Sequence, residues 1–410
     1  MSRWLILIFI AVLVEVYTFQ AFKTIIRTRW ILIGYQLISV SIIAFIIYQF
    51  TNFDRAQGQT PMMQFTIGLL LIFFLPKLFA TLVMLLEDIY RLFDGLISKF
   101  VRNPSRTTFF PERRKFVSTI AIGLAAVPFL SMLYGITKGK YNFKVIRQVI
   151  PYPDLPDAFD GFRITHISDL HCGSFDNADK IAYAVDLINE QNSDVLLFTG
   201  DIVNTHATEM HPWIPTFQKL RKPAFGMYSV LGNHDYGEYT TWESPRHKQV
   251  NFEAIKDLHR QIDFKLLLNE NVTLRKGNDS IKIVGVENWG VRFKQAGDLA
   301  KASEGLSKDD FKILLTHDPS HWEYEVKNHP KNFHLTLSGH THGMQFGIEI
   351  PGYLQWSPAQ YIYKQWAGLY ENLGRYVYVN RGFGFHAFPG RVGIWPEITV
   401  IELKKAQKNA

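Results

Sequence analysis

Residues 194–201 read DVLLFTGD, an apolar run that is bounded by polar residues and ends in a Gly-Asp pair. A short run of this kind is typical of a buried β-strand. Upstream, residues 162–168 form a second strand-like run, and residues 178–191 carry apolar side chains at helical spacing. Strands and helices that alternate along the chain predict an α/β architecture.

More strand-like runs follow, at residues 225–231, 281–286, 312–316, 333–337, 376–379 and 397–403. Several runs are followed by polar segments rich in Asp, Asn and His. These segments are Asp169-Leu170-His171, Gly200-Asp201, Gly232-Asn233-His234-Asp235, Thr316-His317-Asp318 and Gly339-His340-Thr341-His342. Ligand sites in open α/β sheets form at the carboxyl ends of strands. We therefore expect the five segments to meet at one edge of the fold.

The polar segments supply a set of side chains suited to metal ions. The predicted ligands are Asp169, His171, Asp201, Asn233, His317, His340 and His342. Carboxylate, amide oxygen and imidazole ligands suit Mn, Fe, Zn or Mg, of which we favour Mn. In Asp-x-His and His-x-His, side chains two apart on an extended segment point to the same side. Seven ligands exceed the needs of one four-coordinate ion, so we expect two divalent ions that share a carboxylate. The alternative is a histidine-bearing domain without metal.

The five ordered segments resemble the motifs of the calcineurin-like metallophosphoesterases over about residues 145–405. The bacterial membrane-associated or exported branch is the most similar, through Phe162-Arg163-Ile164 and the stretches at 228–231, 378–384 and 395–398. The resemblance implies a four-layer sandwich of two mixed β-sheets flanked by helices. It also implies that one metal takes Asp169, His171, Asp201 and His342, and that the other takes Asp201, Asn233, His317 and His340. His234 would be the catalytic residue that faces the substrate phosphate.

The sequence departs from the family pattern at two positions. Asn204 stands where some members carry an Asp that orients the catalytic histidine, and Met344 stands where this branch often has a second Gly. The first departure weakens the expectation of a charged His–Asp dyad.

The N-terminal part contains four apolar runs, which predict a bundle of about four transmembrane helices with spans near 4–20, 30–50, 62–86 and 116–136. The first run is short and carries Glu15, so its span is the least certain. Glu15 and Lys77 inside the runs are either an interhelical pair or part of a proton pathway, and the pair is the simpler interpretation. Residues 1–140 are thus expected as a membrane region. A linker at 141–156, which Pro151 and its neighbouring prolines favour, a phosphoesterase domain at 157–404 and a tail at 405–410 follow.

Charge is segregated: residues 1–150 carry a net charge of +11 and the remainder −4, which together give the formal +7. The basic excess flanks apolar segments, so it indicates a membrane surface and not nucleic acid. The links after the first and third runs carry ten Lys and Arg against six on the other side. This bias predicts a multi-pass bacterial inner-membrane protein with an extracytoplasmic catalytic domain. The pair Arg113-Arg114 before the fourth run resembles an export signal and agrees.

We therefore expect a membrane-anchored dinuclear-metal phosphoesterase that hydrolyses phosphodiester, phosphomonoester or pyrophosphate bonds of lipid-linked or cell-envelope substrates. Late aromatic residues (Tyr353, Trp356, Tyr361, Tyr363, Trp366 and Tyr370) would form either an apolar rim for lipid or ordinary packing. Two alternatives stay open. One is a pyrophosphatase that splits UDP-diacylglucosamine in lipid A synthesis from a cytoplasmic-facing site. The other is a non-catalytic, metal-bound regulatory subunit.

Overall fold

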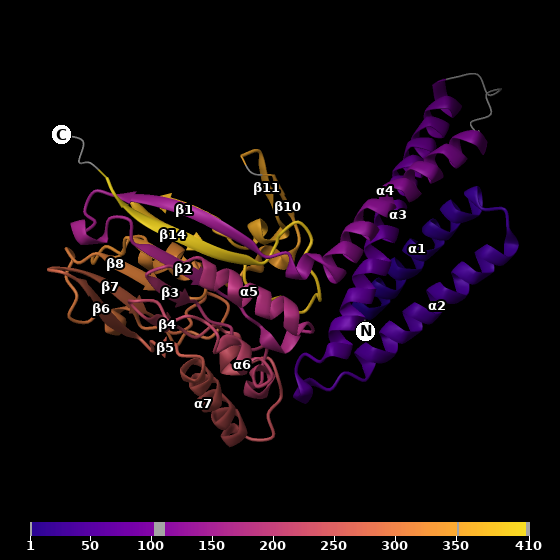
Figure 1. Ribbon diagram of the computed structural model, residues 1–410. Helices are drawn as coiled ribbons and strands as arrows, with labels where there is room; N and C mark the ends of the chain where they lie inside the picture. Colours follow the sequence, from indigo (N-terminus) through magenta and orange to yellow (C-terminus); the bar gives the residue numbers. More distant parts are fainter. Residues whose placement is uncertain (1, 102–110, 351, 407–410) are drawn as a thin grey trace. The chain divides into compact units, whose positions relative to one another are not determined.

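The computed structural model describes residues 2–101, 111–350 and 352–406 (Figure 1). The chain divides into two compact units. The helical unit comprises Met1–Phe53 and Met62–Ile136, and the catalytic unit comprises Asp54–Pro61 and Thr137–Ala410.

The helical unit consists of four long helices: α1 (Ser2–Ile25), α2 (Arg29–Thr51), α3 (Pro61–Val101) and α4 (Pro111–Thr137). Within the described residues, three segments are long and apolar enough to cross a membrane: Arg29–Thr51, Pro61–Ile97 and Glu112–Thr137. The first expected span, near 4–20 in α1, includes residues whose side chains the structure does not describe, so it stays a prediction. The helix α3 continues well beyond the expected span 62–86, because the sequence after Leu86 keeps an amphipathic helical pattern.

Charged side chains inside this unit pair with one another between helices. Lys77 on α3 donates to Glu15 on α1 at 2.5 Å and to Ser39 on α2 at 2.9 Å, which confirms the interhelical pair. At the start of α4, Arg113 and Arg114 bind Glu87 on α3 at 2.9 and 2.6 Å. The arginine pair that resembles an export signal thus holds two helices together. Two residues of the predicted charge bias, Arg102 and Arg106, lie outside the described residues.

The catalytic unit contains two six-stranded sheets. The first has the order β1 (Lys144–Tyr152), β14 (Glu397–Lys405), β2 (Arg163–Ile167), β3 (Val195–Phe198), β4 (Met227–Ser229) and β5 (Lys265–Leu266). The second has the order β12 (Gly368–Asn372), β13 (Arg375–Val379), β9 (Leu335–Ser338), β8 (Lys312–Leu315), β7 (Asp279–Gly285) and β6 (Glu270–Lys276). In the first sheet β14 runs antiparallel to β2, and in the second β6 and β12 run antiparallel to their neighbours. Both sheets are therefore mixed, as expected.

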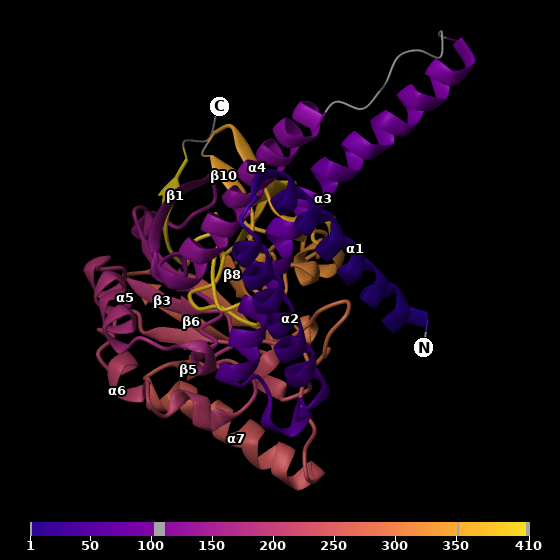
Figure 2. The same cartoon turned by 90° about the vertical axis from the view of Figure 1, so that its right-hand side faces the viewer.

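Alternation of side chains along the strands builds the layers. On β3, Leu197 enters the core between the sheets, whereas Leu196 and Phe198 face the helices α5 (Ala178–Glu190) and α7 (Pro245–Gln261). The second sheet packs its outer face on α8 (Leu299–Ala302) and a helical turn at Trp322–Val326. Figures 1 and 2 show α5, α7 and the short α6 (Ile214–Phe217) outside the strand layers. The four-layer sandwich expected from the sequence is confirmed.

The segment 141–156, expected as a linker, instead contains strand β1, so most of it belongs to the first sheet. This strand pairs along its whole length with β14, with Pro151 opposite Lys404. Since β1 is an edge strand, the missing amide hydrogen of Pro151 does not interrupt the sheet. The expected tail begins later than residue 405, because Lys405 is the last residue of β14, and residues 407–410 lie outside the described part.

The short segment Asp54–Pro61, between α2 and α3 in sequence, belongs to the catalytic unit. The Thr240 hydroxyl donates to the carbonyl of Arg55 at 2.6 Å, and the backbone amide of Ala387 donates to Oε1 of Gln59 at 3.2 Å. Nothing in its composition predicted this grouping, since the segment reads as an ordinary polar turn.

Candidate metal centre

The seven predicted ligands come together at the carboxyl ends of β2, β3, β4, β8 and β9. Two groups have ligand atoms within 4.8 Å of one another. The first group is Asp169, His171 and His342, and the second is Asp201, His317 and His340. Asn233 joins the second group, since its Oδ1 lies 3.1 Å from Nε2 of His317. These residues form one polar cluster, not several separate sites.

The backbone at these positions has an uncommon conformation. The φ angles are 55° at Asp169, 47° at His171, 59° at Asp201, 69° at His340 and 48° at His342. Non-glycine residues adopt this left-handed region infrequently, and such residues cluster at functional sites. The expectation that Asp-x-His and His-x-His act through an extended segment is therefore wrong. Tight left-handed turns after the strands direct these side chains toward one another.

Asp201 connects the two groups. Its Oδ2 lies 3.5 Å from Nε2 of His171 in the first group and 3.1 Å from Nε2 of His317 in the second. Its other oxygen, Oδ1, accepts a hydrogen bond of 2.8 Å from the backbone amide of His234. In the first group, Nε2 of His342 lies 3.1 Å from Oδ1 of Asp169. One carboxylate oxygen thus faces both ligand groups.

Hydrogen bonds at Nδ1 fix the orientation of two imidazole rings, so that Nε2 of each ring points toward the other ligand residues. Nδ1 of His317 donates to the carbonyl of Thr199 at 2.7 Å, and Nδ1 of His171 faces Oδ1 of Asn204 at 3.0 Å. A ring that donates through Nδ1 presents the lone pair of Nε2, which is the arrangement of a metal-ligating histidine. The donor set therefore fits divalent cations.

The electrostatics of the cavity also favour positive charge. Burial by itself lowers the pKa of His317, but Asp201 and Asp169 outweigh burial and raise this pKa to about 10. Burial raises the pKa of Asp169, but His342 and His317 outweigh it and bring the net value below the usual range. Two carboxylates that are fully buried require compensating cations, which a protonated histidine supplies when no other cation does.

Two acidic residues, Asp235 and Glu209, stabilise the loops that carry the ligands. Neither was predicted to be a ligand. The carboxylate of Asp235 accepts hydrogen bonds from the backbone amides of Asp201 and Gly232 through Oδ2, and from Ile202 through Oδ1. Glu209 accepts from the amides of Asn204, Thr205 and His206. Burial raises the pKa of Glu209 to about 7, against the effect of these hydrogen bonds. Asp235 is part of the motif Gly232-Asn233-His234-Asp235, so the sequence predicted that it lies near the site. Its role as an acceptor for backbone amides was not predicted.

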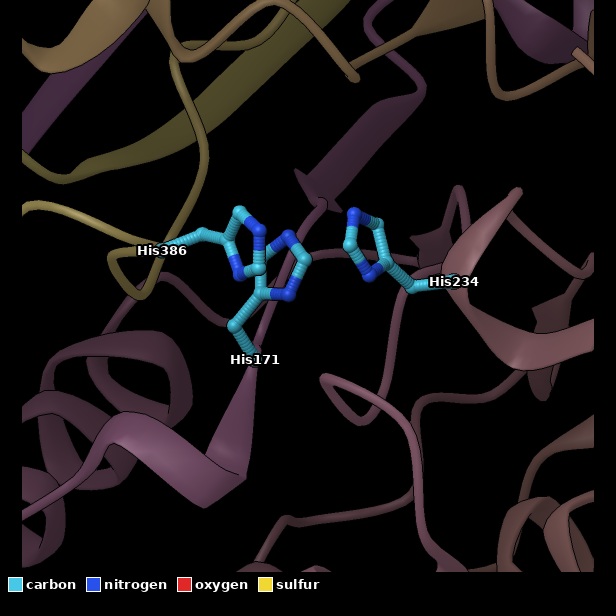
Figure 3. A group of neighbouring side chains, drawn as sticks. All are labelled: His171, His234 and His386. Atoms are coloured by element: carbon cyan, nitrogen blue, oxygen red, sulfur yellow. The ribbon is translucent and has the colours of Figure 1, made fainter. Parts of the chain in front are cut away.

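A further histidine, His386, lies beside the ligand residues and was not predicted from the sequence. It forms a third group with His171 and His234, again with ligand atoms within 4.8 Å of one another (Figure 3). His386 lies in the loop between β13 and β14, which carries no motif with metal-ligand spacing. Only the folding of this loop over the turn at His171 brings it to the site.

Comparisons with known proteins agree with this geometry. Residues 162–344 match the family model of the calcineurin-like phosphoesterases, and residues 2–140 match the model described as "Probable Calcineurin-like phosphoesterase, transmembrane domain". The metallophosphoesterase YkuE of Bacillus subtilis (strain 168) is 33% identical over 254 residues, which are 61% of this chain and 82% of that protein.

Two other relatives extend the comparison. The metallophosphoesterase YkoQ of the same bacterium is 28% identical over 68% of this chain and 98% of its own length. A transmembrane protein with metallophosphoesterase domain from Danio rerio is 30% identical over 67% of this chain, but only 60% of that protein is covered. With the two ligand groups, the two matching family models and the apolar helices of the N-terminal unit, the chain belongs to the calcineurin-like metallophosphoesterases and is a membrane-linked phosphoesterase.

Proposed function

We propose that the catalytic unit holds two divalent ions, Mn in preference to Fe, Zn or Mg, and hydrolyses phosphoric ester bonds with them. Asp169, His171, Asp201 and His342 would hold one ion, and Asp201, Asn233, His317 and His340 the other. The observation that carries this proposal is the position of Oδ2 of Asp201, which faces His171 at 3.5 Å and His317 at 3.1 Å. Ions held in this way supply a nucleophile at neutral pH and a clamp for the phosphoryl oxygens.

His234 is the proposed catalytic residue. Its Nδ1 donates to the backbone carbonyl of Asn204 at 2.8 Å, so Nε2 is directed away from that carbonyl. Its backbone amide holds Oδ1 of Asp201 at 2.8 Å, which ties the ring to the shared carboxylate. A backbone carbonyl therefore takes the orienting role that an Asp side chain has in other members. His234 can stabilise charge on the phosphoryl group or donate a proton to the leaving oxygen.

Exposed apolar side chains on a hairpin after the last ligand motif support a lipid-linked substrate. The hairpin of β10 (Ile348–Ile350) and β11 (Leu354–Trp356) exposes Ile348, Ile350 and Leu354, and Tyr353 is 92% exposed. Of the six late aromatic residues only Tyr353 and Tyr361 are strongly exposed, whereas Trp366 is buried. The rim is therefore mostly aliphatic. A contiguous exposed apolar surface marks an interaction site, and a chain with membrane spans offers lipid as the partner.

Tyr363 connects this part of the chain to the ligand residues. Its hydroxyl lies 2.8 Å from Nε2 of His340 and it follows the exposed residues Tyr361 and Ile362. A lipid tail on the hairpin could thus leave its phosphorylated head group at the ions. Tethering of the catalytic unit to the same membrane raises the effective concentration of such substrates.

The grouping of Asp54–Pro61 with the catalytic unit supports the proposal that both lie on the same side of the membrane. If α3 and α4 both cross the membrane, this segment and the residues after Thr137 emerge on the same side. The excess of basic residues in the links after α1 and α3 supports the proposal that this side is outside the cytoplasm, at a bacterial inner membrane. A cytoplasmic-facing pyrophosphatase would require the opposite orientation.

Turnover of bis-p-nitrophenyl phosphate by the purified full-length chain tests the hydrolase. We expect activity that requires added Mn²⁺ and that Asp201→Asn lowers by at least about 1,000-fold, since the shared ligand is lost. A chain that binds two ions without turning over any phosphoester would instead be the non-catalytic subunit.

The lipid link is tested separately, with Tyr353→Ser combined with Leu354→Ser. This change should leave turnover of the soluble ester unchanged and lower turnover of a phosphorylated lipid in vesicles. Equal loss on both substrates, or no loss on the lipid, would contradict a lipid-binding role for the hairpin.

A further inference from the structure

Three imidazole rings from separate segments meet beside the proposed ion pair. The ring of His386 stacks on His171, with centroids 4.8 Å apart and planes 26° apart, and it meets the ring of His234 edge-on at 4.3 Å. Figure 3 shows the rings of His171, His234 and His386 turned toward one another. His171 is buried, whereas His234 and His386 are only partly buried. His234 and His386 are therefore the two rings of this group that remain partly accessible.

One residue, Asn204, contacts all three rings. Its Oδ1 lies 3.0 Å from Nδ1 of His171 and 3.1 Å from Nδ1 of His386, and its backbone oxygen lies 2.8 Å from Nδ1 of His234. If His171 is to ligate an ion through Nε2, its Nδ1 must carry the hydrogen, so Oδ1 of Asn204 is an acceptor. The same oxygen then accepts from Nδ1 of His386. All three rings consequently turn Nε2 away from Asn204.

The loop that carries His386 is firmly held. The backbone amide of His386 donates to Oε1 of Gln345 at 2.5 Å, and Nε2 of Gln345 donates to the carbonyls of Phe388 and Gly390 at 2.8 and 2.9 Å. Gln345 follows His342 by three residues, so the same turn fixes a proposed ligand and the His386 loop. Such fixation from several directions is typical of a side chain that must be placed accurately for binding.

A third metal ion between these rings is a poor alternative. Nδ1 of His171 is engaged by Asn204, and its Nε2 faces Asp201 at 3.5 Å. His171 therefore has no nitrogen left for an additional ion. His386 lacks a carboxylate partner of its own among the hydrogen bonds and ion pairs of the described residues, although buried cations require anionic ligands.

We propose that His386 is a further substrate-contacting residue of this phosphoesterase, which places Nε2 beside that of His234, and that Asn204 is the positioning residue for both rings and for His171. The proposal rests on the proposed metal-dependent hydrolysis and adds a second imidazole to it. A phosphoryl group held by two ions leaves oxygen atoms on the side away from the ions. Two imidazoles on that side can bind two of these oxygens instead of one, which fixes the orientation of the ester for attack.

The test uses the full-length chain loaded with Mn²⁺. We expect His386→Ala to lower kcat/KM for bis-p-nitrophenyl phosphate by about 10- to 100-fold, as for one lost contact to a charged group, while two Mn²⁺ per chain remain bound. His386→Gln, whose amide can reach the position of Nε2, should recover part of the loss. His247→Ala is the matched control, because His247 is an exposed histidine on α7.

Binding of inorganic phosphate to the same Mn²⁺-loaded proteins, measured by calorimetry, keeps the inference separate from the reaction. We expect His386→Ala to weaken phosphate binding about tenfold. Absence of turnover by the wild-type chain would contradict the proposed hydrolysis, but it would not affect this expectation. Unchanged kcat, KM and phosphate affinity in His386→Ala would overturn the substrate contact. Loss of a bound ion in that variant would also overturn it, since His386 would then be a ligand.

Asn204 is tested by two substitutions. Asn204→Ala should lower both ion occupancy and kcat/KM, because His171 and His386 lose the side-chain oxygen that they share, while the backbone carbonyl that accepts from His234 remains. Asn204→Asp keeps the side-chain acceptor and should retain most ion binding. If Asn204→Ala changes only the unfolding temperature, without a change in ion occupancy or in KM, a positioning role is wrong.

Discussion

The carboxylate of Asp235 accepts a hydrogen bond of 3.0 Å from the backbone amide of Asp201. The same carboxylate accepts from Gly232 at 2.8 Å and from Ile202 at 3.0 Å. It thereby joins the loop after β3, which carries the shared carboxylate, to the loop after β4, which carries Asn233. Hydrogen bonds to Asp235 therefore stabilise the left-handed turn at Asp201, where φ is 59°.

Removing this support should damage the site without removing any proposed ligand. Asp235→Ala leaves three buried amides without an acceptor, and each costs about 1–3 kcal/mol. We expect a lower unfolding temperature together with weaker Mn²⁺ binding, measured by thermal denaturation and by metal analysis after dialysis. Asp235→Asn keeps one acceptor oxygen and should be intermediate. Full ion occupancy in a destabilised Asp235→Ala chain would show that the turn at Asp201 does not depend on Asp235.

Ion binding should release protons and strengthen with pH. In the ion-free chain the pKa of His317 is raised to about 10, against burial, by Asp201 and Asp169. Near neutral pH a binding ion must therefore displace a proton from His317. Below pH 10 the apparent Kd for Mn²⁺ is expected to fall by up to about tenfold for each unit of rising pH. Calorimetry in two buffers of different ionisation enthalpy measures the proton directly, and an identical heat in both buffers would contradict the prediction.

Much of this arrangement could be predicted from the sequence, because buried strands are continuous apolar runs. All five ligand segments were found since each follows such a run. The strands β2, β3 and β8 lie within the predicted ranges, and β9 ends one residue beyond its range. The strands β6 and β12 gave no such signal, because most of their residues are exposed or half-buried. The strand β1 was not predicted, because Pro151 favoured a linker at this position. His386 could not be found, since only the tertiary fold of a loop without metal-ligand spacing brings it to His171.

Acid should destabilise the catalytic unit through a buried histidine outside the ligand motifs. Burial lowers the pKa of His259 on α7 to about 3, from an ordinary value of 6.5. Between pH 6.5 and 3 the unfolded chain binds a proton that the folded chain does not, so stability present above pH 6.5 is lost as pH falls. The loss is about 1.4 kcal/mol for each pH unit.

Replacement of this ring separates its effect from other acid-sensitive groups. His259 stacks on Phe198 with centroids 5.6 Å apart, so His259→Phe keeps an aromatic ring against it. Between pH 7 and pH 5 this variant should lose about 2 kcal/mol less stability than the wild type in denaturant titrations. His247→Phe, at an exposed position of the same helix, is the control, and an equal pH dependence in all three chains would refute the assignment.

The segment between α2 and α3 should influence catalysis through the His386 loop. Oε1 of Gln59 accepts the backbone amide of Ala387, at 3.2 Å, directly after His386. Ala387 has φ of 58°, a strained conformation for a residue with a side chain, so this hydrogen bond helps to maintain the turn. Gln59→Ala should lower kcat/KM by several fold with both ions retained, whereas Gln59→Glu keeps an acceptor and should be milder.

The same segment provides a matched control for this last change. Gln57 is exposed and its side chain donates to Oδ2 of Asp54 at 3.2 Å, so Gln57→Ala should leave kcat and KM unchanged. Equal effects of Gln57→Ala and Gln59→Ala would mean that the segment acts through general packing. A selective effect of Gln59→Ala would instead connect the link between two membrane helices to the position of His386. Because a separately expressed catalytic unit without Asp54–Pro61 lacks this acceptor, it should show the same loss of kcat/KM as Gln59→Ala.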